Sequence, residues 1–504
     1  MEHVEPALVF AGFMGAGKSS AAKTVAAELG VQALDSDHEI ERELGEPIES
    51  WFERNGEAAF REVEEEVVLR LLERPDLRVL ALGGGSLRAD RVQEALRRHV
   101  VVYLDVDTES AWRRCGGTRP LARDRNRFEQ LHEERRPLYE ELADAWLPAA
   151  ERATVRNALP ALAAVARSGL RAKLLWGSSA SGEYPVFFGH GLVREGFFHP
   201  ETGRRFVLSD NNVARLHAVA GDWQHAIPAG EEAKTPQQAT AVLSAMAAAG
   251  VTRADVLAAV GGGVVGDMGG FSAGVYQRGM RWVGIPTTLV AQVDSAFGGK
   301  TGVDLPEGKN YMGVYHQPAS VIVDPDTLAT LPREELAAGY AEVLKTALIA
   351  GGRLWARVRR GGEIDDATIL GCIQTKLSIV AEDERDGGRR QVLNLGHTIA
   401  HAIESATGYS RYRHGEAVAL GLLGALRLSQ RPQLRDEVER LLAAHDLPTR
   451  LDGVTPEQVL PFVERDKKRL GERVPFVLVD QPGVVTPGNE LDPASVEAAL
   501  RELA

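Results

Sequence analysis

One segment constrains the fold of this chain more than any other. Residues 12–19, GFMGAGKS, match the pattern GxxxxGK[ST], and they stand between a short apolar run at 7–11 and a helical pattern at 20–29 that Gly30 ends. Glycines let backbone N–H groups approach phosphate oxygens, and the N-terminal end of a following helix adds positive charge. A strand, this loop and a helix in that order predict a phosphate-binding loop on a parallel sheet.

The loop also assigns chemical roles. Lys18 is placed to reach the outer phosphates of ATP, and the Ser19 hydroxyl to hold Mg²⁺. Asp35 and Asp37 follow the next predicted strand, at 32–34, so one carboxylate would serve the Mg²⁺ shell and the other would accept a hydrogen bond from the hydroxyl that attacks ATP. An aspartate-rich turn or helix cap is the alternative for these two acids. The nucleotide cradle is predicted to comprise Gly12, Gly15, Ala16, Gly17, Lys18, Ser19 and Ser20.

Length and composition set the frame around this loop. The chain has 504 residues, which is too long for one ordinary domain. Its net charge of −13 gives no reason to expect nucleic-acid binding. Two distant cysteines exclude a disulfide framework, and no window is apolar enough for a membrane span or a signal peptide. We therefore expect a cytoplasmic enzyme of several domains, with small-molecule partners and neither a nucleic acid nor a membrane partner.

The order of apolar runs predicts three regions. Further strands at 79–82 and 100–104 and a closing helix at 153–168 complete a βαβ pattern. After a Ser- and Gly-rich stretch, strands are expected at 205–209, 256–260 and 282–285. From about residue 330, helical spacing at 334–349, 369–382 and 416–428 predicts a mostly helical region.

Several polar positions in the front region follow predicted strands or precede helices. Arg61 and Glu64 share one helical face, the glycines Gly83, Gly84 and Gly85 leave room for a ligand, and Arg119 follows a flexible stretch typical of a mobile lid. Arg135 and Arg136 precede Pro-Leu-Tyr.

Residues 1–165 resemble shikimate kinase through GFMGAGKS, DSD, FRxxE, GGG, TRPL and RRPLYEELAD. The resemblance implies ATP-dependent phosphorylation of the 3-hydroxyl of shikimate. It implies that Lys18 and Arg119 stabilise phosphoryl charge and that substrate is held by Asp37, Arg61, Gly83, Gly84, Gly85 and Arg135. Arg136 competes with Arg135, and the family's lid lysine is replaced here by Gly117 and Thr118.

The rear region carries two further signals. GGGVVG at 261–266 follows a predicted strand and contains GxGxxG, which suggests a helix N-terminus that binds a pyrophosphate. His397 and His401 lie four residues apart on one helical face, with His414 and Glu342 elsewhere. Imidazoles with a carboxylate are the usual ligands of catalytic zinc. Scattered cations could converge on a phosphorylated sugar acid, although each alone reads as surface charge.

Residues 182–504 resemble 3-dehydroquinate synthase, most specifically in SAFGGKTGVD and in the pair NLGHTIAHAIE and RHGEAVALG. The resemblance implies Glu342, His397 and His414 as ligands of zinc or cobalt, with His401 on the substrate phosphate. Lys300, Lys345 and His401 would be catalytic. The substrate site would comprise Arg278, Asp294, Lys300, Asn310, Lys345, Lys376, Arg390, Asn394, His401 and Lys467, with Lys468 competing for the last place. NAD would be held by Asp210, Asn212, Glu231, Lys234, Gly261, Gly262, Gly263, Asp267, Thr287, Thr288 and Lys309.

The two resemblances together imply an α/β chain with a P-loop kinase domain at 1–168, a linker at 169–182, an NAD-binding domain at 183–330 and a helical metal domain at 331–504. The implied second reaction cyclises 3-deoxy-D-arabino-heptulosonate 7-phosphate to 3-dehydroquinate with loss of phosphate, in a homodimer formed through the synthase half. The alternatives are a polyol dehydrogenase or another sugar-phosphate cyclase behind, and another small-metabolite kinase or an inactive nucleotide-binding module in front.

Overall fold

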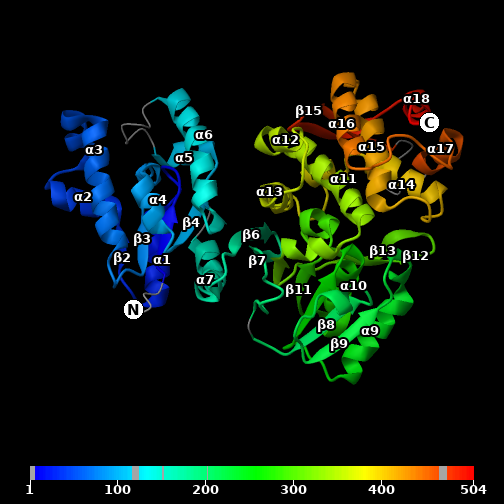
Figure 1. The fold of residues 1–504 in the computed structure, drawn as a ribbon, viewed down its shortest axis with the longest axis horizontal. Coiled ribbons are helices and arrows are strands. Elements are labelled where there is room, and N and C mark those ends of the chain that lie inside the picture. The colour runs from blue at the N-terminus through cyan, green and yellow to red at the C-terminus, as the bar shows by residue number, and fades with distance from the viewer. Residues whose placement is uncertain (1–5, 116–123, 150–151, 201, 465–473) are drawn as a thin grey trace. The chain divides into compact units, whose positions relative to one another are not determined.

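The computed structural model describes residues 6–115, 124–149, 152–200, 202–464 and 474–504 (Figure 1). The chain forms two compact units. The first comprises Met1–Trp176 with Pro185–Gly189, and the second comprises Gly177–Tyr184 with His190–Ala504. Each unit has its own set of parallel strands and its own candidate site, so they are described separately.

A parallel sheet forms the centre of the first unit. Its strand order is β2-β3-β1-β4-β5, and β6 pairs with β5 through Ala145 and Leu174. β1 is buried along its whole length, and so is β4 apart from its last residue, as expected for strands covered on both faces. The strands are β1 (Leu8–Ala11), β2 (Ala33–Asp35), β3 (Val79–Ala81), β4 (Val100–Asp105), β5 (Ala145–Pro148) and β6 (Lys173–Ser179).

Helices connect these strands and cover the sheet. α1 packs on β1 and β3 and lies beside α7, and α2 packs on α3. The helices are α1 (Lys18–Leu29), α2 (Ser36–Leu44), α3 (Ile48–Leu72), η1 (Ser86–Arg88), α4 (Asp90–Leu96), α5 (Thr108–Cys115), α6 (Arg125–Leu142) and α7 (Arg152–Ser168). The predicted βαβ order of the front region is confirmed, with α1 beginning two residues earlier than expected.

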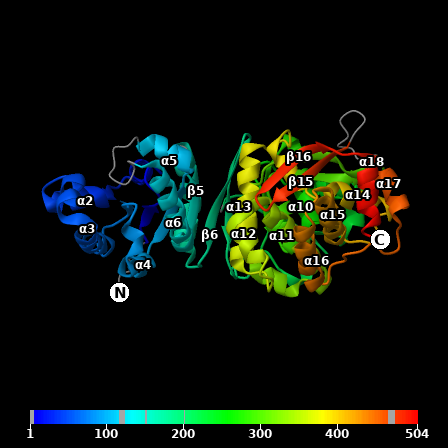
Figure 2. The ribbon, with the colours of Figure 1, turned by 90° about the horizontal axis from the view of Figure 1, so that it is seen from above.

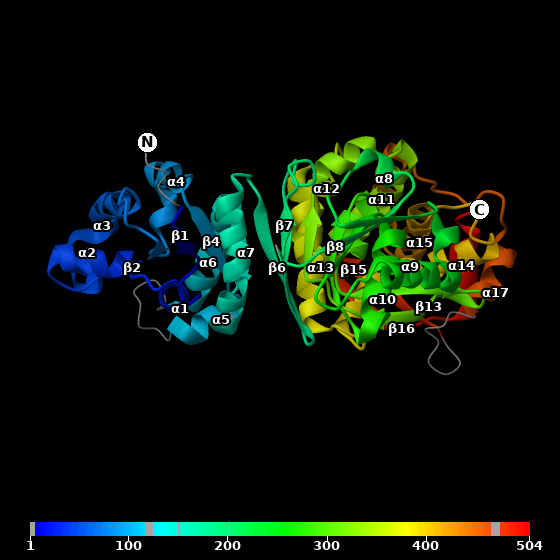
Figure 3. The same cartoon turned by 90° about the horizontal axis from the view of Figure 1, so that it is seen from below.

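The second unit has five parallel strands, paired in the order β14-β11-β10-β8-β9. α10 packs on β10 and β11, and also on the hairpin β12–β13. α10 and β13 lie close together in Figure 3. The elements of this part are β7 (Gly182–Phe188), β8 (Arg205–Asp210), α8 (Val213–Leu216), β9 (Trp223–Ile227), η3 (Glu231–Ala233), α9 (Pro236–Ala248), β10 (Val256–Gly261), α10 (Gly263–Val275), η4 (Tyr276–Arg278), β11 (Arg281–Pro286), η5 (Ala291–Ser295), β12 (Lys300–Leu305), β13 (Gly308–Tyr315), β14 (Ser320–Val323) and η6 (Pro325–Thr330).

A helical part follows, as predicted from residue 330 onward. Figure 2 shows α14, α15, α17 and α18 gathered together. The helices are α11 (Arg333–Ala350), α12 (Gly352–Val358), α13 (Asp366–Glu382), η7 (Arg389–Asn394), α14 (His397–Ala406), α15 (His414–Leu428), α16 (Pro432–Ala444), α17 (Pro456–Glu464) and α18 (Pro493–Arg501). A hairpin of β15 (Pro475–Gln481) and β16 (Val484–Glu490) was not expected there.

The segment expected to be a linker, residues 169–182, contains a strand. β6 occupies Lys173–Ser179, and the division between the two units falls inside β6 and β7. None of the helices in the described part of the chain combines the length and the apolar character that crossing a bilayer requires.

Candidate active sites

The predicted phosphate loop connects β1 to α1 in the first unit. Gly12 and Gly15 have φ of 145° and 78°, and an added Cβ would lie 2.8 Å from Leu104 O and 2.7 Å from Ala111 O. Only glycine fits there, so the loop folds back tightly against the sheet and α5. The Lys18 Nζ donates to the carbonyls of Gly12 and Phe13 at 3.0 and 3.1 Å, which holds the ammonium over the loop.

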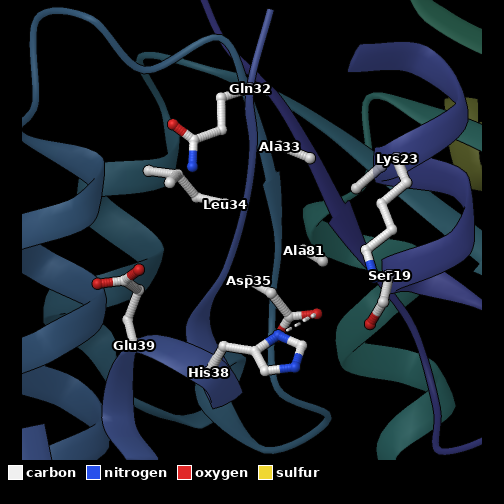
Figure 4. A pocket seen from close by; sticks show the side chains of 10 residues that line it. Ser19, Lys23, Gln32, Ala33, Leu34, Asp35, His38, Glu39 and Ala81 are labelled. Carbon is white, nitrogen blue, oxygen red and sulfur yellow. Dashed lines mark ion pairs between the residues drawn. The ribbon is translucent and has the colours of Figure 1, made fainter. Parts of the chain in front are cut away.

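Two cavities adjoin this loop. One of about 260 Å³ is lined by both loop and acids, including Lys18, Ser19, Asp35, Asp37 and Arg114. Its neighbour of about 190 Å³ lies on the other side of Asp35, where the Asp35 carboxylate and the Ser19 hydroxyl face the same space (Figure 4). Asp35 also caps α2 by accepting from Asp37 N at 3.0 Å. The predicted helix cap and the predicted Mg²⁺ role are thus compatible, because the cap uses one carboxylate oxygen.

Charged side chains converge on the three glycines that follow β3. An added Cβ would lie 2.7 Å from Asp37 Oδ1 at Gly83 and 2.2 Å from Arg61 Nη1 at Gly85. Arg135 Nη1 donates to the Gly84 carbonyl at 2.9 Å, and its Nε is buried with no hydrogen-bond partner in the described residues. A buried guanidinium with an unused N–H fits an anionic ligand.

The structure separates the two candidate arginines of α6. Arg136 pairs with Glu140 at 2.7 Å and with Asp105 at 3.5 Å, so it faces carboxylates already present. Arg61 forms an ion pair with Glu64, which is buried and also accepts from Ser86 Oγ at 2.8 Å. Arg61 and Glu64, which the sequence predicts on one helical face, therefore form a partly buried ion pair beside the glycines.

In the second unit, three helices approach closely enough to bring distant residues together. An added Cβ at Gly415, in α15, would lie 1.9 Å from Ala338 O of α11. One at Gly421 would lie 2.1 Å from Gly396 O, the residue that precedes α14. Glycines at these crossings let the backbones touch, so that α11, α14 and α15 present side chains to one point.

The three predicted metal ligands meet at that point. Glu342 Oε1 lies 3.5 Å from His397 Nε2 and 3.3 Å from His414 Nε2, and one ligand atom from each residue falls within 4.8 Å of the others. Glu342 is fully buried, and its oxygens accept no hydrogen bond of good geometry from the described residues. His401 lies beside the group, with its ring centroid 5.4 Å from that of His397, but is not part of the set. One carboxylate and two imidazoles that converge in this way fit a divalent metal ion.

A buried chain of charges continues from the metal centre. Lys345 Nζ lies 2.5 Å from Glu342 Oε2 and 3.4 Å from Asp294 Oδ2, and Lys376 pairs with the other oxygen of Asp294. Burial lowers the pKa of Lys345, but Asp294 and Glu342 outweigh it and raise that pKa. Burial would raise the pKa of Glu342, but Lys345 and His414 hold it well below its ordinary range. Lys376 keeps a lowered pKa because its burial dominates.

The glycine turn after β10 matches the predicted dinucleotide loop. Gly262 caps α10, and a Cβ there would lie 2.9 Å from the Thr288 side chain. Lys234 is buried and pairs with Asp267, while Asp210 accepts from Asn212 N at 2.8 Å. The start of α10 therefore offers backbone N–H groups and the positive end of the helix dipole, as a pyrophosphate requires.

Several predicted cations of this unit bind carboxylates or backbone carbonyls. Lys300 pairs with Asp386 at 2.6 Å, and buried Arg390 donates through Nη2 to Gly298 O at 3.0 Å, leaving its Nε without a hydrogen-bond partner in the described residues. Lys309 contacts Glu404 at 3.1 Å and Glu231 at 3.5 Å.

Other predicted residues are placed less informatively. Arg278 lies in the exposed turn η4 with φ of 70°, and Asn310 has φ of 57° and donates its N–H to Asp304 at 2.7 Å. Asn394 ends η7. Arg119 and Lys467 lie outside the described residues.

Some residues at these sites were not predicted as site residues from the sequence. Arg114 donates to Gly15 O at 3.2 Å, and Tyr139 donates to Gly84 O at 2.5 Å. Asp386 and Glu404 pair with predicted site lysines. No pattern distinguishes these residues from surface groups, apart from the position of Glu404 one turn after His401 in the predicted helix.

Comparisons with known proteins match different families to the front and the rear of the chain. The family model for shikimate kinase matches residues 14–165. The models for the N-terminal and C-terminal parts of 3-dehydroquinate synthase match residues 224–338 and 339–469.

Individual relatives cover the rear of the chain. A 3-dehydroquinate synthase from Symbiobacterium thermophilum is 38% identical over 350 residues, which are 64% of this chain and 98% of the relative. One from Acidithiobacillus ferrooxidans is 40% identical over 344 residues, covering 63% and 94%. A solved structure of 2-epi-5-epi-valiolone synthase from Streptomyces hygroscopicus, with NAD+ and Zn2+ bound, is 27% identical with a TM-score of 0.58, covering 64% of this chain and 96% of that one.

Proposed function

The chain belongs to the 3-dehydroquinate synthase family and carries a shikimate kinase domain ahead of it, and on that premise we propose how its two sites work. It is a bifunctional enzyme of aromatic amino acid biosynthesis. The front unit phosphorylates shikimate with ATP, and the rear unit cyclises 3-deoxy-D-arabino-heptulosonate 7-phosphate to 3-dehydroquinate with release of phosphate. The alternative of a polyol dehydrogenase is not favoured, because the synthase relatives match along 94–98% of their own length.

In the kinase site, we propose that the loop and the start of α1 bind the phosphates, with Lys18 over the transferred group. Ser19 and Asp35 would hold Mg²⁺, which supplies charge neutralisation when bound. Asp37, which lies beside Gly83, would accept the proton of the attacking hydroxyl, and the unused Nε–H of Arg135 would bind the substrate carboxylate.

In the synthase site, Glu342, His397 and His414 would hold zinc or cobalt, and the turn after β10 would hold NAD. When bound, NAD accepts and returns a hydride, and the metal ion polarises the reacting oxygen as a Lewis acid. This chain's own residues provide the rest. The pairs Lys345–Asp294 and Lys376–Asp294 form a buried set of donors and acceptors that orients substrate hydroxyls and passes protons.

We assign the binding of the substrate's anionic groups to Arg390, Lys300 and His401. Arg390, with one unused buried N–H, and Lys300 would receive the carboxylate, and His401 would contact the phosphate. Asn310, Asn394, Arg278 and Lys467 stay proposed substrate contacts. The remaining proposed NAD contacts are Asp210, Asn212, Glu231, Lys234, Gly261, Gly262, Gly263, Asp267, Thr287, Thr288 and Lys309.

We further propose a homodimer formed through the synthase unit and action in the cytoplasm, where ATP and NAD are available. Sedimentation of the full chain tests the first point, because a monomer at micromolar concentration contradicts it.

The observation that carries the assignment is the meeting of Glu342, His397 and His414 from three helices. The full chain should release phosphate from the heptulosonate phosphate in the presence of NAD and zinc, yield 3-dehydroquinate and accumulate no NADH. Glu342→Ala should abolish this activity and spare shikimate phosphorylation, whereas Lys18→Ala should do the reverse. Loss of both activities in either folded variant would refute two independent sites.

A further inference from the structure

Glu404 is a buried carboxylate at the edge of the proposed metal centre that none of the roles above uses. It lies on α14, the helix that begins at His397, and its carboxylate faces His414 at the start of α15, with only 2% of its surface exposed. One oxygen, Oε1, serves two partners, Lys309 Nζ at 3.1 Å and His414 Nδ1 at 3.4 Å. The other, Oε2, is buried and accepts no hydrogen bond in the described residues.

The two rings of His414 and His397 are oriented by different means. His414 turns Nδ1 toward Glu404 and Nε2 toward Glu342, and His397 turns Nδ1 toward the backbone carbonyl of Leu395, at 3.2 Å, and Nε2 toward Glu342. An acceptor at Nδ1 places the proton there, which leaves the Nε2 lone pair for a metal ion. His414 depends on a side-chain carboxylate for this, so its tautomer is open to substitution.

We propose that Glu404 is a positioning residue, which fixes the tautomer and ring angle of His414 while holding Lys309 against the dinucleotide site through the same carboxylate. The inference rests on the proposed metal centre and adds a residue to it. A single carboxylate shared by a metal ligand and a cofactor-site lysine ties the two sites together, because Lys309 lies on β13 of the α/β part and His414 begins α15 of the helical part.

The test measures metal affinity rather than turnover. Metal-free full-length protein is titrated with Co2+ or Zn2+ against a chromophoric chelator, and the Co2+ absorption bands are recorded. Glu404→Gln keeps the shape of the side chain but weakens the acceptor at Nδ1. We expect a dissociation constant raised about 10- to 100-fold and altered Co2+ bands. Preserved shikimate kinase activity and circular dichroism report that the variant is folded.

Two controls separate positioning from a general loss of structure. Glu416 lies in the first turn of α15, the helix that begins with His414, and its carboxylate accepts from Arg413 N at 2.8 Å. Glu416→Gln should leave the metal dissociation constant within about twofold. Lys309→Gln keeps Glu404 and removes its cation. It should weaken NAD binding and leave metal affinity within about threefold, because Glu404 still accepts from His414.

The outcomes are distinct. Equal metal affinity for wild type and Glu404→Gln overturns the inference, as does an equal loss in Glu416→Gln. A loss in Lys309→Gln as large as that in Glu404→Gln also overturns it, since the carboxylate would then act through the lysine. Failure of the wild-type chain to bind either metal, with His414→Ala no different, refutes the proposed metal centre itself. If Glu404→Gln does not fold, Glu404→Asp with the same titration decides the question, because a shortened carboxylate should weaken metal binding without removing charge.

Discussion

Asp294 is the shared partner of two buried lysines, and its replacement by asparagine offers a sharp test of the charge network. Lys345 and Lys376 face Asp294 and Glu342, so two positive and two negative groups balance. Asp294→Asn keeps the shape and removes one negative charge. Lys345 retains Glu342 at 2.5 Å, but Lys376 loses the anion beside it.

Two routes to the cost agree. The attraction between Asp294 and Lys345 at 3.4 Å is about 5 kcal/mol at an effective dielectric constant of about 20, before the burial of Asp294 is discounted. Alternatively, Lys376 gives up its proton, which costs about 1.4 kcal/mol for each pH unit below its ordinary pKa, or about 4.6 kcal/mol at pH 7. Removing one partner of a buried pair typically costs about 3–5 kcal/mol. We therefore expect a loss of about 3–5 kcal/mol at pH 7.

The second route gives a pH dependence with a definite sign. Neutral Lys376 binds one proton fewer in the folded variant than in the unfolded chain, so the variant gains stability relative to wild type as pH rises. The deficit should shrink by about 1.4 kcal/mol per pH unit, to about 2 kcal/mol at pH 9. This direction follows from the pKa of Lys376, which burial already lowers in the wild type.

Hydrogen exchange of the metal-free full chain in increasing urea, resolved by peptide, measures this. Amides of α11 and α13 report the second unit, and amides of α1 and α3 serve as an internal reference that should not change. Asp326→Asn is the matched control: it removes a half-exposed carboxylate that pairs with His190 at 2.6 Å, and should cost less than about 1 kcal/mol. A deficit for Asp294→Asn that is below about 1 kcal/mol, or that stays constant from pH 7 to pH 9, would refute the reasoning.

Three further outcomes are expected. Arg135→Lys should raise the KM for shikimate about tenfold or more while Arg136→Lys changes it less than threefold, and equal effects in steady-state assays would contradict the geometry of α6. Burial lowers the pKa of His99, so its neutral form contributes stability above about pH 6.5 that is lost as pH falls through the folded-state pKa. Protection of the β1 amides against hydrogen exchange should therefore fall more between pH 7.5 and 5.5 in wild type than in His99→Gln. A zinc-selective chelator with excess Mg²⁺ should stop phosphate release from the heptulosonate phosphate and spare the kinase, and retained synthase activity in metal-depleted protein would count against the centre at Glu342.

The amino-acid sequence by itself determined the features that depend on near neighbours. The run from Gly12 to Ser19 predicts its own loop, since glycine φ angles and the helix that follows are local properties. The alternation of strands and helices likewise predicts two parallel sheets and a helical part, because hydrophobic period and chain connectivity suffice for that. The family resemblance then predicted which glutamate and which two histidines meet.

Only the tertiary structure decided which polar side chains share one site. Arg135 and Arg136 are adjacent and chemically identical, and what separates them is that one reaches Gly84 while the other finds Asp105 and Glu140. Helical spacing fixes the face on which a residue lies but not the element that the face meets. For the same reason, the sequence does not distinguish Glu404 from other carboxylates. Its place beside His414 depends on Gly415 and Gly421, which let α15 pack against α11 and α14. The distance between residues far apart in the chain is set by packing, which only the complete fold determines.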